Sequence, residues 1–255
     1  MAAPEEPPQE PPTEPAPGPA PDLGEPPGTP LIADACLRLG LPLRLAPAGL
    51  RPVRSGARVA APVLPVRHYG SVDVFLEAFE RATAAGTAPG AVLVVDNGGR
   101  TDEACIGDLV VLEAEAAGLA GLVVWGLHRD TADIAAIGLP VFSYGALPAG
   151  PVRLDDQEPQ ALTSARFGPG LVVDGTDVVF GDDDGALFVP AARAAEVVRT
   201  AHAILRTERD QARRIRTGDT LRRQTGFAGY LTRRAADPAY TFRHHLRRIG
   251  GAIEE

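Results

Sequence analysis

The sequence predicts a single α/β domain followed by a helical extension, and three observations support this. Short runs of branched apolar residues alternate with segments of helical period between residues 31 and 190. Glycines separate most of these segments, as expected for turns. Pro190 then introduces a long helical segment. With 255 residues, 45% of them apolar, the chain can form one large core or two small ones.

The N-terminal 30 residues are rich in proline and glutamate and contain no basic residue. They have almost nothing apolar to bury, so the entropy cost of ordering them is not offset. We expect residues 1–30 to be a disordered tail, 31–190 to be the α/β domain, and 191–255 to be an arginine-rich helical extension.

In the first half of the domain, each element has its own signal. Residues 31–39 predict a short helix closed by Gly40. Residues 58–65 alternate small and branched side chains, as in a strand. Residues 72–85 have the 3.6-residue period of a helix, and the branched run at 91–95 predicts a fully buried strand.

The second half continues the alternation. A helix is expected at 107–118, with Leu109, Leu112 and Ala116 on its inner side. The acidic run Asp182-Asp183-Asp184 is expected to be a solvated turn. The other expected elements are strands at 122–125, 141–143, 170–180 and 186–189 and helices at 131–137 and 191–217.

Charge and cysteine usage limit the functional classes. The net charge is −8 and the pI about 5.2, so we do not expect nucleic acid to be a partner of the whole chain. Residues 193–255 nevertheless carry 14 arginines against 7 acidic residues, which favours an oligomer interface over RNA binding.

No apolar run is long enough for a membrane span. Cys36 and Cys105 are expected to be free thiols, and the chain is expected to be cytoplasmic.

The chain contains no lysine, because all 25 basic residues counted as Lys or Arg are arginine. A lysine Schiff base is therefore excluded, and so is pyridoxal-phosphate chemistry of the usual kind. Activation of a carbonyl would have to come from a metal ion, arginine or backbone amides.

The most informative feature is Asp108, followed by the adjacent pair Arg129-Asp130. The pair comes just after an apolar run and a glycine, where a buried strand reaches the surface. A guanidinium can bind a carboxylate through two hydrogen bonds, and an aspartate can hold a hard divalent cation. The combination suits a small anionic substrate.

These residues resemble a known family. Asp108 and Arg129-Asp130 are spaced as in the class II pyruvate aldolases related to the regulator of RNase activity A (RraA), which include 4-hydroxy-4-methyl-2-oxoglutarate aldolases. The resemblance covers about 31–220, and includes the segments 32–35, 94–99 and 181–190. It implies a swivelling-domain-type β/β/α sandwich that assembles as a homotrimer or a dimer of trimers, with active sites between subunits.

The resemblance also implies roles for individual residues. Asp130 would bind Mg²⁺ or Mn²⁺, and Arg129 would bind the carboxylate and keto oxygen of a pyruvyl group. Asp108 would hold water at the metal or relay a proton. Gly107 and the backbone amides of Leu109 and Val110 would receive the substrate carboxylate.

Two further acidic residues match positions that reach the metal-bound waters from a neighbouring subunit, Asp34 and Glu208. Each has a simpler interpretation: Asp34 as a helix cap or solvated side chain, and Glu208 as an ion-pair partner of Arg209 or Arg213.

The expected function is that of a divalent-metal-dependent lyase that cleaves a 4-hydroxy-4-methyl-2-oxoglutarate-type aldol or decarboxylates oxaloacetate through a pyruvate enolate. The alternative is a non-catalytic regulator that binds a ribonuclease. Trp125 favours the regulator, because that branch has an aromatic where the aldolases have aspartate, although core packing also accounts for it. His128 is expected to point into solvent and is left out of the site.

Overall fold

The computed structural model describes residues 23–249. Residues 1–22, which are most of the predicted disordered tail, and residues 250–255 lie outside the described part. Order is established earlier than Leu31, because helix α1 spans Thr29–Arg38 and Thr29 is buried.

A central sheet organises the domain. The strand order across the sheet is β1 (Arg51–Pro52), β7 (Val141–Ser143), β5 (Gly121–Trp125), β3 (Val92–Asp96), β2 (Val59–Arg67), β10 (Asp177–Asp182) and β11 (Gly185–Pro190). The core of the sheet is a parallel set in which β2 pairs with β3, β3 with β5 and β5 with β7, while β1, β10 and β11 add antiparallel at the two edges.

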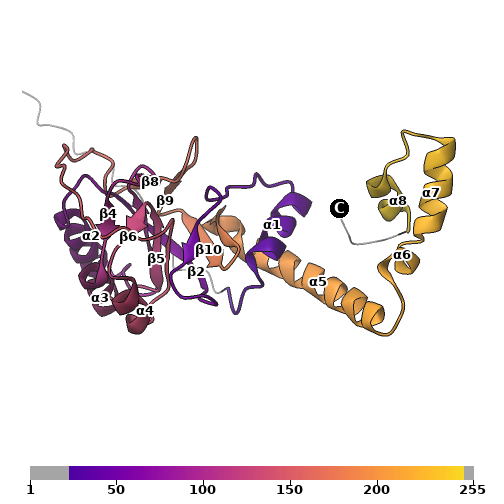
Figure 1. The fold of residues 1–255 in the computed structure, drawn as a ribbon, viewed down its shortest axis with the longest axis horizontal. Coiled ribbons are helices and arrows are strands. Elements are labelled where there is room, and N and C mark those ends of the chain that lie inside the picture. The colour runs from indigo at the N-terminus through magenta and orange to yellow at the C-terminus, as the bar shows by residue number, and fades with distance from the viewer. Residues whose placement is uncertain (1–22, 250–255) are drawn as a thin grey trace, which may run out of the picture.

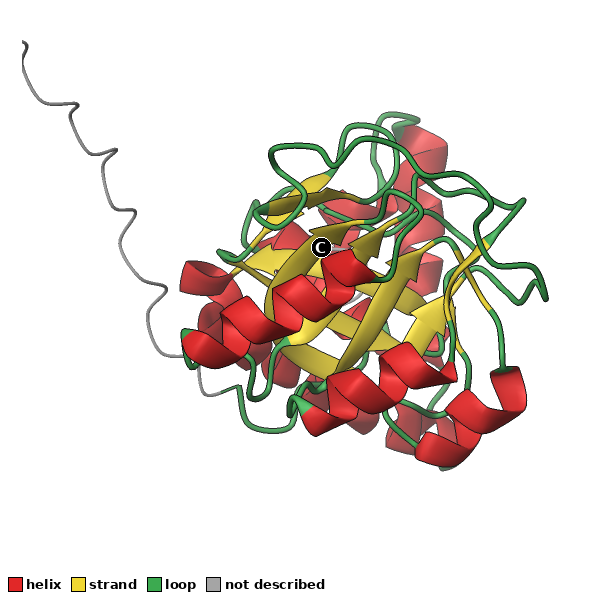
Figure 2. Ribbon diagram, turned by 90° about the vertical axis from the view of Figure 1, so that its left-hand side faces the viewer, coloured by secondary structure: helices red, strands yellow, loops and turns green. Residues whose placement is uncertain are grey.

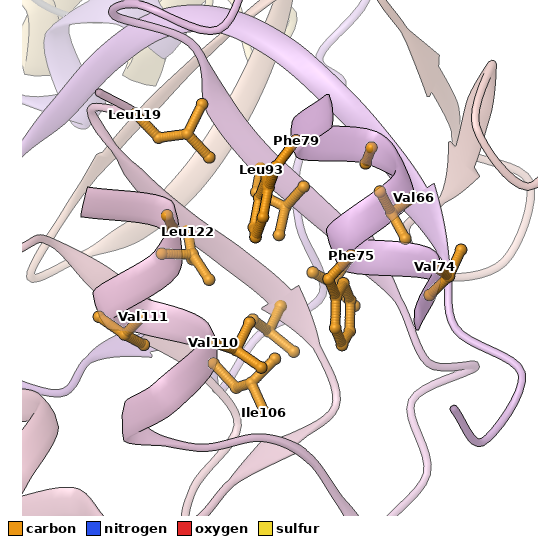
Figure 3. Close-up of a cluster of buried hydrophobic side chains, with 14 of the residues drawn as sticks. Val66, Val74, Phe75, Phe79, Leu93, Ile106, Val110, Val111, Leu119 and Leu122 are labelled. Carbon is orange, nitrogen blue, oxygen red and sulfur yellow. The ribbon is translucent and has the colours of Figure 1, made fainter. Parts of the chain in front are cut away.

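Helices cover one face of this sheet (Figures 1 and 2). Over the parallel strands lie α2 (Asp73–Ala84), α3 (Asp108–Ala116) and α4 (Thr131–Ile137). Figure 3 shows Phe75 and Phe79 of α2 and Val110 and Val111 of α3 around Leu93 and Leu122 of the sheet. Over β10 and β11, a second group packs α1 against α5 (Ala191–Arg216).

The opposite face is covered by a small antiparallel hairpin, β8 (Ser164–Arg166) and β9 (Val172–Asp174). Ala165, Phe167 and Val173 pack there against Val94 and Phe142 of the central sheet. With apolar layers on both of its faces, β3 is buried at every position, which accounts for its unbroken branched run. The predicted β/β/α sandwich with a helical extension is confirmed.

The last part of the chain leaves this body. Ile204 is the last residue of α5 that belongs to the core, yet the helix continues to Arg216. Short helices α6 (Leu221–Gln224), α7 (Phe227–Ala236) and α8 (Phe242–Ile249) follow. Figure 1 shows them at the far end of α5, well away from the sheet. We call residues 205–249 the arm.

Two local expectations need correction. Leu109, Leu112 and Ala116 were expected on the inner side of α3, but Val110, Val111 and Ala114 are buried there instead. The Asp182 turn is not merely solvated, because Asp182 accepts hydrogen bonds from Thr29 N at 2.7 Å and Thr29 Oγ1 at 2.6 Å.

The expectation for the cysteines agrees with the structure. Cys36 and Cys105 are buried free thiols, and burial raises the pKa of Cys105 to about 12. Within residues 23–249, no helix is both long enough and apolar enough to cross a membrane.

Candidate active site

Two very short strands bring the predicted residues together. β4 (Ala104–Ile106) pairs in parallel with β6 (Leu127–His128), and Arg129 N donates to Ile106 O at 3.0 Å. The chain therefore leaves both strands at the same end, toward Gly107-Asp108 on one side and Arg129-Asp130 on the other. Residues about twenty positions apart in sequence become neighbours by this pairing.

Gly107 lies directly beneath the Arg129-Asp130 pair. A β-carbon placed at Gly107 would come within 2.5 Å of Asp130 Oδ2 and 3.2 Å of Arg129 Nε. The Gly107 backbone is extended, so the requirement for glycine here comes from this close approach and not from its dihedral angles. The two side chains face each other across 3.4 Å, Arg129 Nε to Asp130 Oδ2.

Asp130 has an unusual backbone. Its φ of 60° and ψ of 41° are left-handed, and among the described residues no other non-glycine has a positive φ. The strain of such a conformation is of order 1–3 kcal/mol. It places Asp130 just ahead of α4, where its side chain makes no capping bond with the helix. The Asp130 carboxylate therefore stays available to a ligand, and its side chain is 35% exposed.

Asp108 is the first residue of α3. The first amides of a helix have no intrahelical acceptor and carry a partial positive charge. Leu109 N donates to Asp108 Oδ1 at 2.8 Å, so this carboxylate already occupies the helix end.

His128 differs from the sequence expectation. It is buried, with Nδ1 2.6 Å from Ser143 Oγ and Nε2 2.9 Å from Thr131 Oγ1. Burial lowers the pKa of His128. Both ring nitrogens are engaged, so His128 anchors the segment that carries Arg129 and does not face solvent.

The two remaining predicted residues lie elsewhere in the chain. Asp34 is exposed on α1, and Glu208 is exposed on α5 beyond the core. Figure 1 shows α1 and α5 displaced from α3 and α4 along the molecule. One chain therefore does not bring Asp34 or Glu208 to the Arg129-Asp130 pair. Arg213 pairs with Asp210 rather than with Glu208.

At the candidate site, a single chain offers one or two carboxylates as ligands for a metal ion. Among residues 23–249, no three histidine, cysteine or acidic side chains gather as a metal cluster. Mg²⁺ commonly keeps several waters and takes only one or two protein carboxylates. The Asp130 carboxylate, held over Gly107 with no capping bond of its own, fits this kind of site, and Asp108 directly follows that glycine in the sequence.

Sequence reasoning missed a second polar region. A cavity of about 270 Å³ lies at the carboxyl ends of β2 and β3, where His68, Asn97 and Arg153 form part of its lining. Glu103 is buried nearby, and Arg153 Nη2 lies 3.0 Å from Glu103 Oε1. Only the loop after β3 had a sequence signal, its Asp-Asn-Gly-Gly run. Glu103 and Gly107 stand at opposite ends of β4, roughly 13 Å apart along an extended chain.

Trp125 ends β5 and packs inward. Its ring centroid lies 6.4 Å from that of Phe167, and it contacts the core on the β8–β9 side. A β-carbon at Gly99 would come within 2.7 Å of Trp125 Nε1. The tryptophan thus covers the loop after β3, as the core-packing interpretation predicts.

The fold and the site together define an α/β-sandwich protein with a guanidinium and two carboxylates at a helix N-terminus. Residues 29–188 match the RraA-like family, described as Aldolase/RraA. The chain therefore belongs to the RraA-like family.

Two relatives are similar to parts of this chain. Protein DlpA of Legionella pneumophila is 29% identical over 177 residues, which are 68% of this chain and 28% of that protein. An Alcanivorax borkumensis protein, named as a proposed 4-hydroxy-4-methyl-2-oxoglutarate aldolase, is 35% identical over 103 residues, covering 40% of this chain and 62% of that protein. The matches thus span less than two thirds of either relative.

A solved structure has the same fold. Streptomyces coelicolor RraAS2, described as an unusual member of the RNase ES inhibitor RraA protein family, superposes with a TM-score of 0.60 at 26% identity. The match covers 73% of this chain and 93% of that one.

Proposed function

We propose that the protein is a divalent-metal-dependent lyase that acts on a 2-oxo acid through a pyruvate enolate. The substrate would be an aldol of the 4-hydroxy-4-methyl-2-oxoglutarate type, or oxaloacetate. The observation that carries the proposal is the placement of Arg129 and Asp130 over Gly107, at the N-terminus of α3. The family and the aldolase name of one relative support it.

The binding half of the reaction uses Arg129 and the start of α3. The first-turn amides, including those of Leu109 and Val110, would receive the substrate carboxylate. The Arg129 guanidinium, half exposed, would hold the carboxylate and the keto oxygen. Asp130 would bind Mg²⁺ or Mn²⁺, which supplies positive charge where the enolate oxygen develops. Because the chain has no lysine, a Schiff base cannot take this role.

The chemical half uses Asp108 as the proton carrier. In aldol cleavage the 4-hydroxyl loses its proton toward Asp108, and its oxygen forms a carbonyl at C4 as the C3–C4 bond breaks. The C4 fragment leaves as a carbonyl compound, and the electron pair of the broken bond leaves the other fragment as an enolate on the keto oxygen. The proton then returns to C3 and gives pyruvate. Decarboxylation releases carbon dioxide and needs no base for its first step. Loss of Asp108 should therefore harm cleavage more than decarboxylation.

The test is pyruvate release from oxaloacetate and from 4-hydroxy-4-methyl-2-oxoglutarate, with added Mg²⁺ and after chelation. Asp130→Asn and Arg129→Ala should each lower turnover at least a hundredfold, because each removes charge that stabilises the enolate. Asp133→Asn, an exposed aspartate in the first turn of α4, is the matched control and should leave turnover unchanged.

Two outcomes would reject parts of the proposal. Equal turnover in the Asp130 and Arg129 variants would remove the site assignment. The absence of turnover on any 2-oxo acid would favour the second candidate function, a protein-binding regulator of a ribonuclease. The structural similarity to Streptomyces coelicolor RraAS2 supports that alternative, and inhibition of a purified ribonuclease by the Arg129→Ala variant would establish it.

A further inference from the structure

His128 and Thr131 stand on either side of the Arg129-Asp130 pair, and their side chains join across it. His128 Nε2 lies 2.9 Å from Thr131 Oγ1, and this contact closes a loop of four residues. His128 is the last residue of β6, and Thr131 is the first residue of α4. The bond therefore links the end of the strand directly to the start of the helix, with the two candidate site residues in between.

The other side of the His128 ring is attached to the central sheet. Its Nδ1 lies 2.6 Å from the Oγ of Ser143, which is the last residue of β7. His128 and Ser143 are both buried. A neutral imidazole has one donor and one acceptor nitrogen, and a hydroxyl can take either role, so both bonds form in either tautomer. Ser143, His128 and Thr131 thus form a continuous row of hydrogen bonds from β7 to α4, which we call the clasp.

The backbone ahead of Asp130 is held as well. The carbonyl oxygen of His128 accepts a hydrogen bond from Leu147 N at 2.9 Å. At the next residue, Arg129 N donates to Ile106 O at 3.0 Å. The chain is therefore fixed on both sides just before it turns into α4. The direction of its carboxylate then depends on the dihedral angles of Asp130 itself.

Asp130 has a competing conformation that would serve α4 better. An aspartate just before a helix usually has an extended backbone and accepts a hydrogen bond from an amide of the first turn. Asp130 instead has a φ of 60° and makes no such bond. A left-handed backbone is strained for a residue with a side chain, and it persists only where the surrounding structure imposes it. Contacts outside Asp130 must therefore favour the observed conformation.

The conformation matters because the space around the pair is narrow. Arg129 runs between two glycines. A β-carbon would come within 3.2 Å of its Nε at Gly107, and within 3.1 Å of its Nη1 at Gly150. The Asp130 carboxylate occupies the same space, since its Oδ2 would lie 2.5 Å from the β-carbon at Gly107. A change of Asp130 to the capping conformation would turn this carboxylate away from Gly107 and toward the amides of α4.

We infer that the clasp holds Asp130 in the left-handed conformation, and so keeps its carboxylate at the candidate site instead of at the N-terminus of α4. His128, Ser143 and Thr131 are then positioning residues, which act through Asp130. This conformational role stands by itself, whereas its consequence for metal binding and turnover rests on the proposed function. Without the clasp Asp130 would exchange between the two conformations, and occupying the site conformation for about a tenth of the time would weaken metal binding about tenfold.

Thr131→Val tests the clasp with little disturbance, because Thr131 is exposed and valine has nearly the same shape without the hydroxyl. In a crystal structure of this variant we expect Asp130 to have a negative φ and to accept a hydrogen bond from a first-turn amide of α4. Thr131→Ser keeps the hydroxyl and should keep φ near 60°. Thr207→Val, on the exposed part of α5, is the matched control and should leave Asp130 unchanged.

Titration with Mn²⁺ alone gives the functional readout. Thr131→Val should bind the ion about tenfold more weakly than the unaltered chain, while Thr131→Ser and Thr207→Val should bind it with the unaltered affinity. Pyruvate release from oxaloacetate should fall in Thr131→Val at low Mn²⁺ and recover at high Mn²⁺, because the bound ion draws Asp130 back to the site. A general structural defect would not be repaired by excess metal.

The two proposals fail separately. A left-handed Asp130 in the Thr131→Val crystal structure would overturn the role of the clasp, whatever the turnover. A negative φ in that variant, with Mn²⁺ binding equal to that of the unaltered chain, would overturn the link between the clasp and the metal. A negative φ, with neither Mn²⁺ binding nor turnover in the unaltered chain, would support the clasp and reject the proposed function.

Discussion

Asp130 shows how one residue can reveal a site. Aspartate tolerates the left-handed region better than most residues, but the conformation still costs free energy. This conformation turns the Asp130 carboxylate over Gly107 and beside Arg129. The Arg-Asp dipeptide is visible in the sequence, while the backbone geometry that places it over Gly107 is not.

Gly107→Ala tests this geometry directly. The added β-carbon would displace Asp130 Oδ2, which lies 2.5 Å from it. We expect pyruvate release to fall at least tenfold while the thermal midpoint changes little, because the Gly107 backbone suits alanine. Gly175→Ala is the control, since its β-carbon would have its nearest neighbour, Val63 O, at 3.9 Å. Full activity in Gly107→Ala would show that the position of Asp130 does not matter.

His68 makes stability depend on pH. It is buried beside the cavity, and burial lowers its pKa from the usual 6.5; Arg153 lowers it further, while Asn97, Glu103 and Asp73 act in the opposite direction. The unfolded chain then binds more protons than the folded chain as pH falls through about 6.5. Stability is therefore present above that pH and is lost below it, by at most about 1.4 kcal/mol per pH unit for one proton.

Urea unfolding between pH 7.5 and 5.5 measures this effect. In His68→Gln the fall in unfolding free energy over this range should be smaller than in the unaltered chain. His244→Gln, which changes an exposed histidine of α8, should keep the full pH dependence. An unchanged slope in His68→Gln would mean that His68 is not the residue responsible.

At the scale of elements, the acidic turn links two distant parts of the chain. Asp182 is the last residue of β10 and accepts hydrogen bonds from both Thr29 N and Thr29 Oγ1. The side chain thus satisfies an amide at the start of α1, 153 residues earlier in the sequence. Asp182, which the sequence predicts to be solvated, therefore helps to hold α1 over β10 and β11.

Removing this link should weaken α1. Asp182→Ala is expected to lower the unfolding free energy by about 1 kcal/mol, as for the loss of a helix cap. Asp184→Ala in the same exposed turn is the control, because in the described structure its hydrogen bonds come from its backbone. Urea denaturation monitored by circular dichroism compares the two, and equal stability would contradict the linking role of Asp182.

α3 shows where element prediction succeeds and where it stops. The residues at 107–118 correctly predict a helix, but the apolar positions form two stripes and only one can face the core. The sheet selects Val110, Val111 and Ala114, because Gly107 and β4 set the rotation of the helix at its first turn. The sequence pattern alone contains no such constraint. The sequence does not predict β4 and β6 for a related reason. Strands of three and two residues are too short to show an alternation of apolar and polar side chains.

At the scale of the whole molecule, the body and the arm are separable. All three core clusters end at or before Ile204, so the residues beyond it add nothing to the interior of the body. The charge divides in the same way, because residues 23–204 contain 22 acidic residues and 13 arginines while the arm is strongly basic.

A chain ending at Thr217 tests this division. We expect the body to keep its circular dichroism spectrum and a thermal midpoint within a few degrees of the full chain at low protein concentration. Unfolding of the shortened chain would show that the arm belongs to the body's fold.

The sequence by itself determined the order of the main helices and strands, the α/β class, the lack of lysine chemistry, and the choice of Asp108 and Arg129-Asp130 as candidate site residues. Those properties depend on local period, composition and spacing, which a sequence contains. Only the tertiary structure decided that His128 is buried, that α3 turns Leu109 and Leu112 outward, and that Asp34 and Glu208 lie apart from the site within one chain. These outcomes depend on which side chains pack against the sheet. That packing involves residues that are far apart in the chain, so a local sequence pattern does not specify it.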